Sequence, residues 1–327
     1  MEYRKLGRTG LDVSRLCLGC MSFGDPDWLV HPWVLGRDDA MPFFERAVEA
    51  GINFFDTADM YSFGVSEEIT GEALGKLLPR EEAVIATKLG LSMGKGPNSS
   101  GLSRKRIVDC VESSLDRLGT DYIDILYIHR LDPETPMEEI VEGLAQVVGD
   151  GSVRYLGASS MYAWQFAKMR EMQRAAGCPP FAVMQNFYNL LYREEEREMI
   201  PYCASEGVAV VPWSPLARGF LAGNTPKGGE ATKRGQRDPR SKDYFGSDTD
   251  YEIASVVAAI ASERGVSPAQ IALAWVLSRG DITAPIVGAT KMRHLDDAIA
   301  ALSLTLEPAE IARLEAPYRP RAIMGHS

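Results

Sequence analysis

Short apolar runs alternate with longer amphipathic stretches along most of this 327-residue chain. Each run spans only a few residues rich in Val, Ile, Leu and Phe, which predicts strands. The predicted strands cover residues 16–18, 52–55, 83–87, 123–128, 153–158, 181–184, 208–212 and 282–287. Helices are predicted after most of them, over residues 42–50, 67–78, 104–118, 137–148, 163–175, 194–205 and 295–302, and two more at 251–263 and 268–277.

The helix predicted over residues 104–118 illustrates the pattern. Ile107 and Val111 belong to an apolar stripe that recurs with helical spacing, which indicates one buried face. Ser103 stands where a side-chain oxygen can cap the first turn, and Gly119 stands where a helix commonly ends. The boundaries and the buried face of this helix therefore follow from the sequence.

The predicted strands are apolar on both faces, which is typical of parallel strands covered by helices. Eight strands, most of them followed by a helix, predict an α/β fold, the (β/α)8 or TIM barrel. A doubly wound sheet is the alternative, but no Gly-x-Gly-x-x-Gly pattern follows an early strand. Residues 3–13 predict an amino-terminal β-hairpin.

Two long loops, at 90–101 and 217–251, interrupt the alternation of strands and helices. Loops of that length inside a compact domain are usually functional lids or disordered segments. Neither loop resembles a linker between domains, and the chain contains no internal repeat. We therefore expect a single barrel domain over residues 1–327.

Composition narrows the class of protein. A hydrophobic share of 45% and a charged share of 24% are typical of a soluble globular protein, and a net charge of −10 argues against a nucleic-acid partner. No apolar run is long enough to span a membrane, so no membrane partner is expected. Five scattered cysteines predict reduced thiols and a cytoplasmic location. Cys17 and Cys20 would face opposite sides of one strand, so we predict buried small side chains rather than a metal site.

Within the segment 51–61 an apolar run ends abruptly in an aspartate, Asp56. Alternation along a strand would place Ile52, Phe54 and Asp56 on one face, with Tyr61 in the loop that follows. A carboxylate at the end of an apolar face is costly to bury unless a charged or hydrogen-bonding partner is present. Asp56 therefore predicts a partner on a neighbouring strand.

The next two strands supply candidates, because Lys88 and His129 end their apolar faces in the same way. In a barrel the carboxyl ends of all strands meet at one face, where chemistry is usually found. The remaining strands also end in residues able to contact a ligand: Ser159, Gln185, Trp213, Ser214 and the segment 288–291.

These four residue types suggest a proton-donating pocket. A free tyrosine titrates near pH ~10, and a neighbouring ammonium such as Lys88 would lower the pKa of Tyr61. Asp56 would hold Lys88, and His129 would hydrogen-bond the same substrate oxygen. Such a pocket suits an alkoxide that develops during hydride transfer to a carbonyl. Taken singly, each residue could equally be a rim tyrosine, a structural ion pair or a core-edge histidine.

The segment 51–61, together with Ala86-Thr87-Lys88 and Leu126-Tyr127-Ile128-His129, resembles the signature segments of the aldo-keto reductases, and the resemblance covers nearly the whole chain. It implies that Tyr61 is the general acid, that Lys88 and Asp56 tune it, and that His129 orients the carbonyl. It also implies an oxidoreductase that reduces aldehydes or ketones to alcohols reversibly. The segments 185–196 and 212–219 look like the microbial branch near aryl-alcohol dehydrogenases and potassium-channel β-subunits.

The resemblance further implies a nicotinamide cofactor. Ser159 and Gln185 would bind the carboxamide, although Ser160 stands where an asparagine is common, and Trp213 would stack on the ring. The loop with Ser214, Leu216, Arg218 and Gly219 would wrap the pyrophosphate. The last segment would hold the adenosine 2′-phosphate and adenine through Gly288, Thr290, Lys291, Arg293, His294 and Asp297. Its basic helix start suits a dianion, so we predict NADP(H) rather than NAD(H).

Two alternatives stay open at this point: an NADP(H)-binding regulatory or redox-sensing subunit with slow turnover, and a cofactor-independent isomerase or lyase. The substrate is expected to be a small aldehyde or ketone. Trp28, Trp33, Met60 and Met93 would give a mouth suited to aromatic or bulky carbonyls, or would only anchor loops. The oligomeric state does not follow from the sequence.

Overall fold

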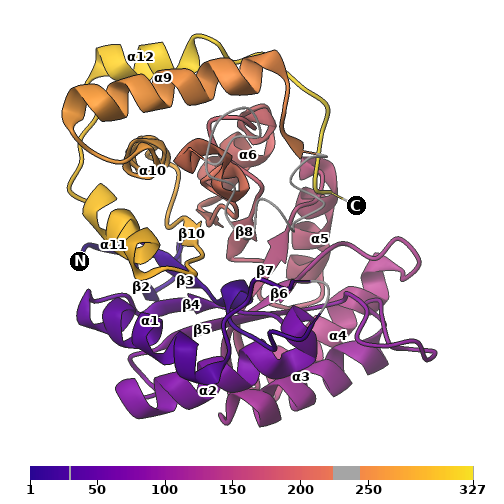
Figure 1. The fold of residues 1–327 in the computed structure, drawn as a ribbon. Coiled ribbons are helices and arrows are strands. Elements are labelled where there is room, and N and C mark those ends of the chain that lie inside the picture. Colours follow the sequence, from indigo (N-terminus) through magenta and orange to yellow (C-terminus); the bar gives the residue numbers. More distant parts are fainter. Residues whose placement is uncertain (29–30, 224–243, 327) are drawn as a thin grey trace.

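Eight short parallel strands form the centre of the protein (Figure 1) in the computed structural model, which describes residues 1–28, 31–223 and 244–326. Backbone N–H groups of Thr283 and Ile286 donate to the carbonyls of Val210 and Pro212, both at 2.8 Å, so the first and last strands of the sheet also meet. The predicted (β/α)8 barrel is confirmed. The order of the strands is β10 (Ile286–Val287), β3 (Cys17–Gly19), β4 (Phe54–Asp56), β5 (Val84–Leu89), β6 (Ile123–Ile128), β7 (Val153–Ser159), β8 (Val183–Gln185) and β9 (Ala209–Val210).

The α-helices surround this ring. Among the described residues, none of these helices has both the length and the apolar character that a membrane span requires. Ser103 accepts a hydrogen bond from the Arg106 backbone at 3.3 Å, and Gly119 ends the helix with a left-handed φ of 63°, as predicted. The helices are α1 (Arg37–Glu49), α2 (Val65–Leu77), α3 (Arg104–Leu118), α4 (Met137–Gly149), α5 (Ala163–Ala175), α6 (Met199–Glu206), α9 (Asp248–Arg264), α10 (Pro268–Ser278), α11 (Met292–Ala301) and α12 (Pro308–Glu315), with short 3-10 turns η1 (Cys20–Ser22), η2 (Tyr61–Gly64), η3 (Glu194–Glu196) and η4 (Ala217–Ala222).

Two predicted helix starts were wrong. Helix α1 begins at Arg37 and keeps Pro42 inside, because acidic residues in its first turn favour an earlier start. The helix predicted over residues 194–205 begins only at Met199, because Glu194 instead accepts hydrogen bonds from Tyr318 and from the Arg321 backbone.

Helix α12 was not predicted. It pairs with α9 outside the ring, where the Figure 1 view shows the two helices side by side. Its capping box, formed by Glu307 and Glu310, was a readable signal in the sequence.

The core has two layers separated by the strands. Phe54, Val84 and Ile125 fill the barrel, whereas Ile52 belongs to the layer between strands and helices. The predicted shared face of Ile52, Phe54 and Asp56 is therefore wrong at its first member, because β4 begins only at Phe54. Cys17 points into the barrel and Cys20 into the outer layer, and both are buried free thiols, as expected from strand alternation.

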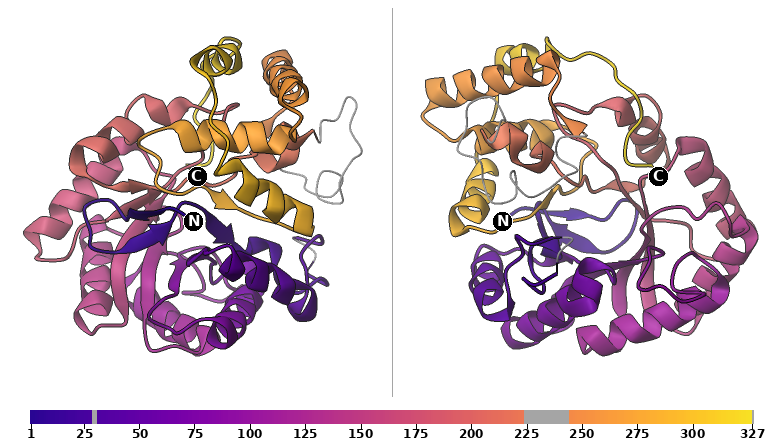
Figure 2. Two further views of the ribbon diagram at one scale, coloured as in Figure 1. Left: turned by 90° about the vertical axis from the view of Figure 1, so that its left-hand side faces the viewer. Right: turned by 45° about the vertical axis from the view of Figure 1, so that its right-hand side comes forward.

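The amino-terminal hairpin covers one end of the barrel. Strands β1 (Tyr3–Lys5) and β2 (Asp12–Ser14) pair antiparallel, and Leu6 and Val13 pack into the barrel cluster. The Arg8 N–H donates to the Gly207 carbonyl, just before β9, at 2.8 Å. The hairpin (indigo) crosses the ring in the left view of Figure 2. Because it closes the amino ends of the strands, the carboxyl ends are the face left for chemistry.

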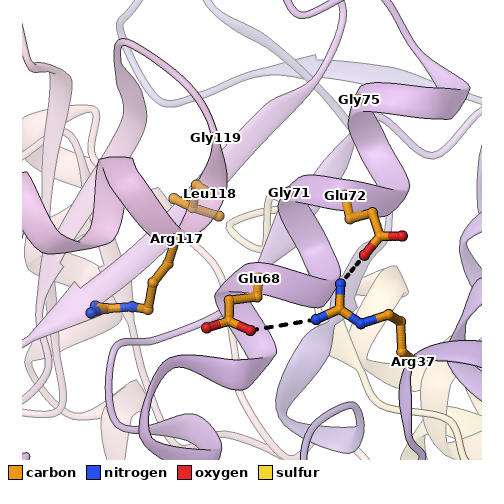
Figure 3. A pocket seen from close by; sticks show the side chains of 8 residues that line it. All are labelled: Arg37, Glu68, Gly71, Glu72, Gly75, Arg117, Leu118 and Gly119. Atoms are coloured by element: carbon orange, nitrogen blue, oxygen red, sulfur yellow. Dashed lines mark hydrogen bonds and ion pairs between the residues drawn. The ribbon is translucent and has the colours of Figure 1, made fainter.

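Helices α2 and α3 approach closely at a glycine. A Cβ atom added to Gly71 would lie 2.1 Å from the backbone oxygen of Leu118, whereas one added to Gly75 on the same helix would meet nothing within 4 Å. Figure 3 shows both glycines on α2 beside the end of α3. The two positions form a matched pair for testing this contact.

We predict that Gly71→Ala lowers the free energy of unfolding by about 1–3 kcal/mol, because α2 and α3 must separate to admit the methyl group. Gly75→Ala should instead be neutral or stabilising by up to about 1 kcal/mol, since alanine is the better helix former. Urea unfolding midpoints of the two variants provide the measurement. Equal midpoints would contradict the close approach of the helices.

Candidate functional site

A buried lysine lies at the centre of the carboxyl-end face of the barrel. The Lys88 side chain is fully buried on β5, and its ammonium donates to Asp56 Oδ2 at 2.6 Å, to the Thr57 carbonyl at 2.7 Å and to Tyr61 Oη at 3.1 Å. Gln185, at the end of β8, donates to the other Asp56 oxygen at 2.7 Å. The contacts bring together the residues that the sequence suggested at separate strand ends.

Backbone hydrogen bonds hold the loop that carries Tyr61. The Thr57 N–H donates to the Ala86 carbonyl at 2.8 Å, and the Asp59 N–H donates to the Lys88 carbonyl at 3.1 Å, so the loop continues along β5. After Tyr61 the chain makes a left-handed turn through Ser62 and Phe63, with φ values of 50° and 51°. Such conformations cost energy in residues other than glycine, and they cluster at active sites and ligand-binding segments.

Protonation of these groups follows from burial and pairing. Burial alone would lower the pKa of Lys88, but Asp56 and Tyr61 outweigh this effect, and the pKa of Lys88 is raised above its usual value. The lysine is therefore a permanent ammonium. Burial raises the pKa of Asp56, and Lys88 and Gln185 oppose that rise.

The pKa of Tyr61 differs from the sequence expectation. Burial raises it above the usual value for a phenol, and the ammonium of Lys88 offsets only part of this increase. The expected net lowering was wrong, because the sequence could not show that the phenol is 8% exposed. The hydroxyl group therefore keeps its proton at neutral pH.

His129, directly after β6, lies edge-on to Tyr61, with ring centroids 5.9 Å apart. Burial lowers the pKa of His129 well below its usual value, and the charges of Lys88 and Arg130 lower it further. The imidazole is therefore neutral. Its buried Nδ1 has no hydrogen-bond partner among the described residues, so the ring has capacity left for a ligand.

The residues expected to bind a nicotinamide lie beside this group. Ser159, at the end of β7, donates to the Gln185 carbonyl at 3.0 Å. The Trp213 indole stacks on Phe187 at 4.3 Å between centroids, and its Nε1 donates to Ser160 Oγ at 2.9 Å. The position that departs from the common asparagine thus orients the indole, which sequence reasoning missed. Gln185, by contrast, already donates its amide to Asp56.

The remaining predicted cofactor residues lie on two adjoining segments. Ser214, Leu216, Arg218 and Gly219 follow β9, where the Ser214 carbonyl accepts from Asn189 at 3.0 Å and Arg218 lies over the Tyr244 ring. Gly288, Thr290, Lys291, Arg293, His294 and Asp297 follow β10 and begin α11. Burial lowers the pKa of His294, and Arg293 and Lys291 lower it further, so three basic side chains gather at one helix start. Of the predicted 217–251 loop, residues 224–243 lie outside the described part of the chain.

Arg130 was not predicted from the sequence, although it directly follows His129. It donates to the His129 carbonyl and, at 3.2 Å, to Ser159 Oγ, and its guanidinium lies 5.8 Å from the centroid of the Trp213 ring. Arg130 therefore connects the half of the site around Tyr61 with the half around Trp213. The signal that the sequence offered for Arg130 was its position directly after His129, at the end of a predicted strand.

A surface hollow of about 450 Å³ lies elsewhere, between α1, α2 and the end of α3. Figure 3 shows Arg37 bridging Glu68 and Glu72 across it. None of the predicted site residues lines this hollow. It therefore belongs to the contact between outer helices rather than to the carboxyl-end site.

Comparisons with known proteins identify the family. The sequence pattern of the Aldo/keto reductase family matches residues 15–319. The chain belongs to the aldo/keto reductase family. It is 45% identical to a versiconal hemiacetal acetate reductase of Aspergillus parasiticus, over 99% of this chain and 98% of that protein. It is also 43% identical to a putative aryl-alcohol dehydrogenase of Schizosaccharomyces pombe and 42% identical to an aldo-keto reductase of Alternaria alternata, each over 99% of this chain and over 97% and 94% of those proteins.

Membership of this family makes the protein an oxidoreductase and supports the reduction of carbonyl compounds in general. Aldo/keto reductases generally use nicotinamide cofactors and small carbonyl substrates. The resemblance drawn from the strand-end motifs is thereby confirmed at the level of the family.

In this aldo/keto reductase a second cluster of buried polar and charged groups joins the loop that carries Tyr61 to helix α3. Asp59 is 1% exposed, and Arg106 Nη2 and Cys110 Sγ, both on α3, each lie 3.8 Å from Asp59 Oδ2. Asp59 Oδ1 has no hydrogen-bond partner in the described part of the chain. Burial, and then the charge of Glu67 on α2, raise the pKa of Asp59 to about 7, although Arg106 and Arg117 oppose them.

We predict that Asp59 makes stability fall as the pH rises from about 4 to about 7. In this window the folded state holds a proton on Asp59 that the unfolded state has lost, so each pH unit removes about 1.4 kcal/mol at most. Asp59→Asn should lose this dependence, whereas Asp281→Asn, at an exposed position, should keep it. Urea unfolding of the three chains between pH 4 and pH 8 is the measurement. A constant difference between wild type and Asp59→Asn would contradict the raised pKa.

Proposed function

We propose that this protein reduces aldehydes or ketones to alcohols with NADPH, reversibly, with Tyr61 as the general acid. The observation that carries the proposal is the position of the Lys88 ammonium, which contacts Asp56 and Tyr61 at 2.6 and 3.1 Å in a buried site. A protonated phenol beside a fixed ammonium is the arrangement needed to release a proton to a developing alkoxide.

The chain's own residues would divide the reaction as follows. The neutral His129 imidazole would donate a hydrogen bond to the substrate carbonyl oxygen and so orient it toward Tyr61. As negative charge grows on that oxygen, the Tyr61 hydroxyl gives up its proton, and the Lys88 ammonium stabilises the phenolate left behind. Asp56 keeps Lys88 in place and compensates its charge. NADPH, when bound, supplies the hydride to the carbonyl carbon.

The residues present fit this cofactor. Lys291 and Arg293 stand at the start of α11, where positive side chains combine with backbone donors, as a phosphate requires, and His294 lies beside them. Trp213 offers an indole already oriented by Phe187 and Ser160. The 2′-phosphate of NADPH, absent from NADH, is the group for which the three basic residues are suited.

Carbonyl compounds with an aromatic or bulky group are the substrates we favour. Phe63 is 54% exposed immediately after the Tyr61 segment and packs edge-on against Trp28 at 5.6 Å. One protein similar to this chain is named as a putative aryl-alcohol dehydrogenase, and an aryl alcohol carries an aromatic group. We also propose a cytoplasmic location, because all five cysteines are free and buried.

Tyr61→Phe should lower kcat for an aromatic aldehyde by about 1,000-fold or more, because the proton donor is lost. The dissociation constant for NADPH should change less than about threefold, since the ring remains. Steady-state kinetics and NADPH titration monitored by tryptophan fluorescence are the measurements. Undiminished turnover in the variant would rule out Tyr61 as the donor, and negligible wild-type turnover across an aldehyde panel would favour a regulatory subunit.

Replacing both Lys291 and Arg293 with alanine should weaken NADPH binding by about tenfold or more, while NADH binding changes less than about twofold. The expected difference arises because only NADPH carries the 2′-phosphate. Lys76→Ala, which removes an exposed cation from α2, is the control variant. Equal effects on both nucleotides would overturn the assignment of these residues to the phosphate.

A further inference from the structure

We propose that His326 is a positioning residue for the cofactor. It closes a strap, residues 321–326, that holds the Trp213 indole in place to stack on the nicotinamide ring. The inference rests on the proposed function, because it takes Trp213 as the side chain that contacts this ring. His326 belongs to none of the segments that the sequence suggested for the cofactor.

The strap follows α12 and runs toward the start of α5 (Figure 1). Arg321 anchors its beginning, because the guanidinium donates to Asp250 Oδ1 at 2.9 Å and to the Tyr244 carbonyl at 2.8 Å. Further along, the Met324 N–H donates to Tyr192 Oη at 3.0 Å. The strap is therefore fixed to the body of the protein before it reaches the site.

The backbone of Gly325 lies against the edge of the Trp213 indole. A Cβ atom added to Gly325 would lie 3.1 Å from Trp213 Cζ2 and 3.8 Å from Phe187 Cβ. Phe187 stacks on the same indole at 4.3 Å between centroids, and Ser160 accepts from its Nε1 at 2.9 Å. The strap therefore supports an indole that Phe187 and Ser160 hold from other sides.

His326 closes the strap on Glu195, which lies in η3. Its Nε2 is 3.0 Å from Glu195 Oε1, and both side chains are almost fully buried. The other Glu195 oxygen accepts from Asn186 Nδ2 at 2.9 Å, and the Asn186 carbonyl accepts from the Trp213 N–H at 2.8 Å. The His326 ring also packs edge-on against Tyr162 at 4.8 Å between centroids. His326 is thus connected both to the backbone of Trp213 and, through the preceding residue, to its ring.

A buried carboxyl group needs hydrogen-bond partners, and Asn186 and His326 contact one Glu195 oxygen each. Loss of the imidazole would remove one of these contacts and release the end of the strap. An aromatic side chain that must be ordered when the ligand arrives contributes less to affinity than one already in position. A less restrained Trp213 should therefore weaken the binding of nucleotides that carry a nicotinamide.

The test measures the dissociation constants of two ligands by isothermal titration calorimetry. One is NADPH, and the other is adenosine 2′,5′-bisphosphate, which carries the 2′-phosphate but no nicotinamide. For His326→Ala we expect NADPH binding to weaken by about three- to tenfold, while the bisphosphate constant stays within about twofold of wild type. His326→Gln keeps a nitrogen donor for Glu195 and should restore NADPH binding to within about twofold of wild type. Arg319→Ala is the control, because this exposed side chain donates to backbone carbonyls of its own segment.

A pair of glycine variants tests the contact with the indole separately. Gly325 and Gly177, which follows α5, have left-handed φ values of 82° and 69°, so alanine is strained at both positions. A Cβ atom at Gly177 would meet nothing within 4 Å, whereas one at Gly325 meets Trp213. Gly325→Ala should therefore weaken NADPH binding by about threefold or more, and Gly177→Ala should leave it within about twofold of wild type.

Unchanged NADPH binding in His326→Ala would overturn the inference, as would equal NADPH constants for the two glycine variants. Weakening of the bisphosphate in parallel with NADPH would also overturn it, because it would indicate a general structural role for the strap. Failure of wild type to bind NADPH would instead contradict the proposed function. The two failures are therefore distinguishable in a single set of titrations.

Discussion

Burial of the Lys88 ammonium is the constraint on which the rest of the site depends. A fully buried cation is tolerated only when a carboxylate and further acceptors surround it, and here Asp56 and the Thr57 carbonyl serve this purpose at 2.6 and 2.7 Å. Meeting this requirement fixes the end of β4 against β5. Gln185 extends the same network across the barrel to β8 by donating to Asp56. Tyr61 is then the third neighbour of an ammonium that is already immobile.

Much of this arrangement could be predicted because it depends on strand alternation. Side chains two residues apart share a face, so Val84 and Ala86 inside the barrel required Lys88 to point inward at the carboxyl end. The same reasoning placed Tyr127 and His129. The closed, parallel barrel followed from strands that are apolar on both faces, and the helix over residues 104–118 from its apolar stripe and its two caps.

Features that depend on packing between distant segments could not be predicted. Burial raises the pKa of Tyr61, where the sequence had suggested a lowered value. The depth of burial depends on the tertiary structure, so this shift could not be foreseen. The hydrogen bond from Trp213 to Ser160 joins two strand ends 53 residues apart. The path of Arg130 toward Ser159 likewise depends on how β6 and β7 lie together. Ile52 was assigned to the wrong face because its strand begins two residues later than the apolar run suggested.

We propose that the buried charge pair, and not the phenol alone, makes Tyr61 a proton donor. The most direct test is the double variant Lys88→Met/Asp56→Asn, which removes both charges and leaves neither one unpaired. Its turnover of an aromatic aldehyde and its NADPH affinity would be measured beside those of wild type. We expect a folded protein that binds NADPH but turns over at least about 100-fold more slowly. Turnover within a few-fold of wild type would contradict it.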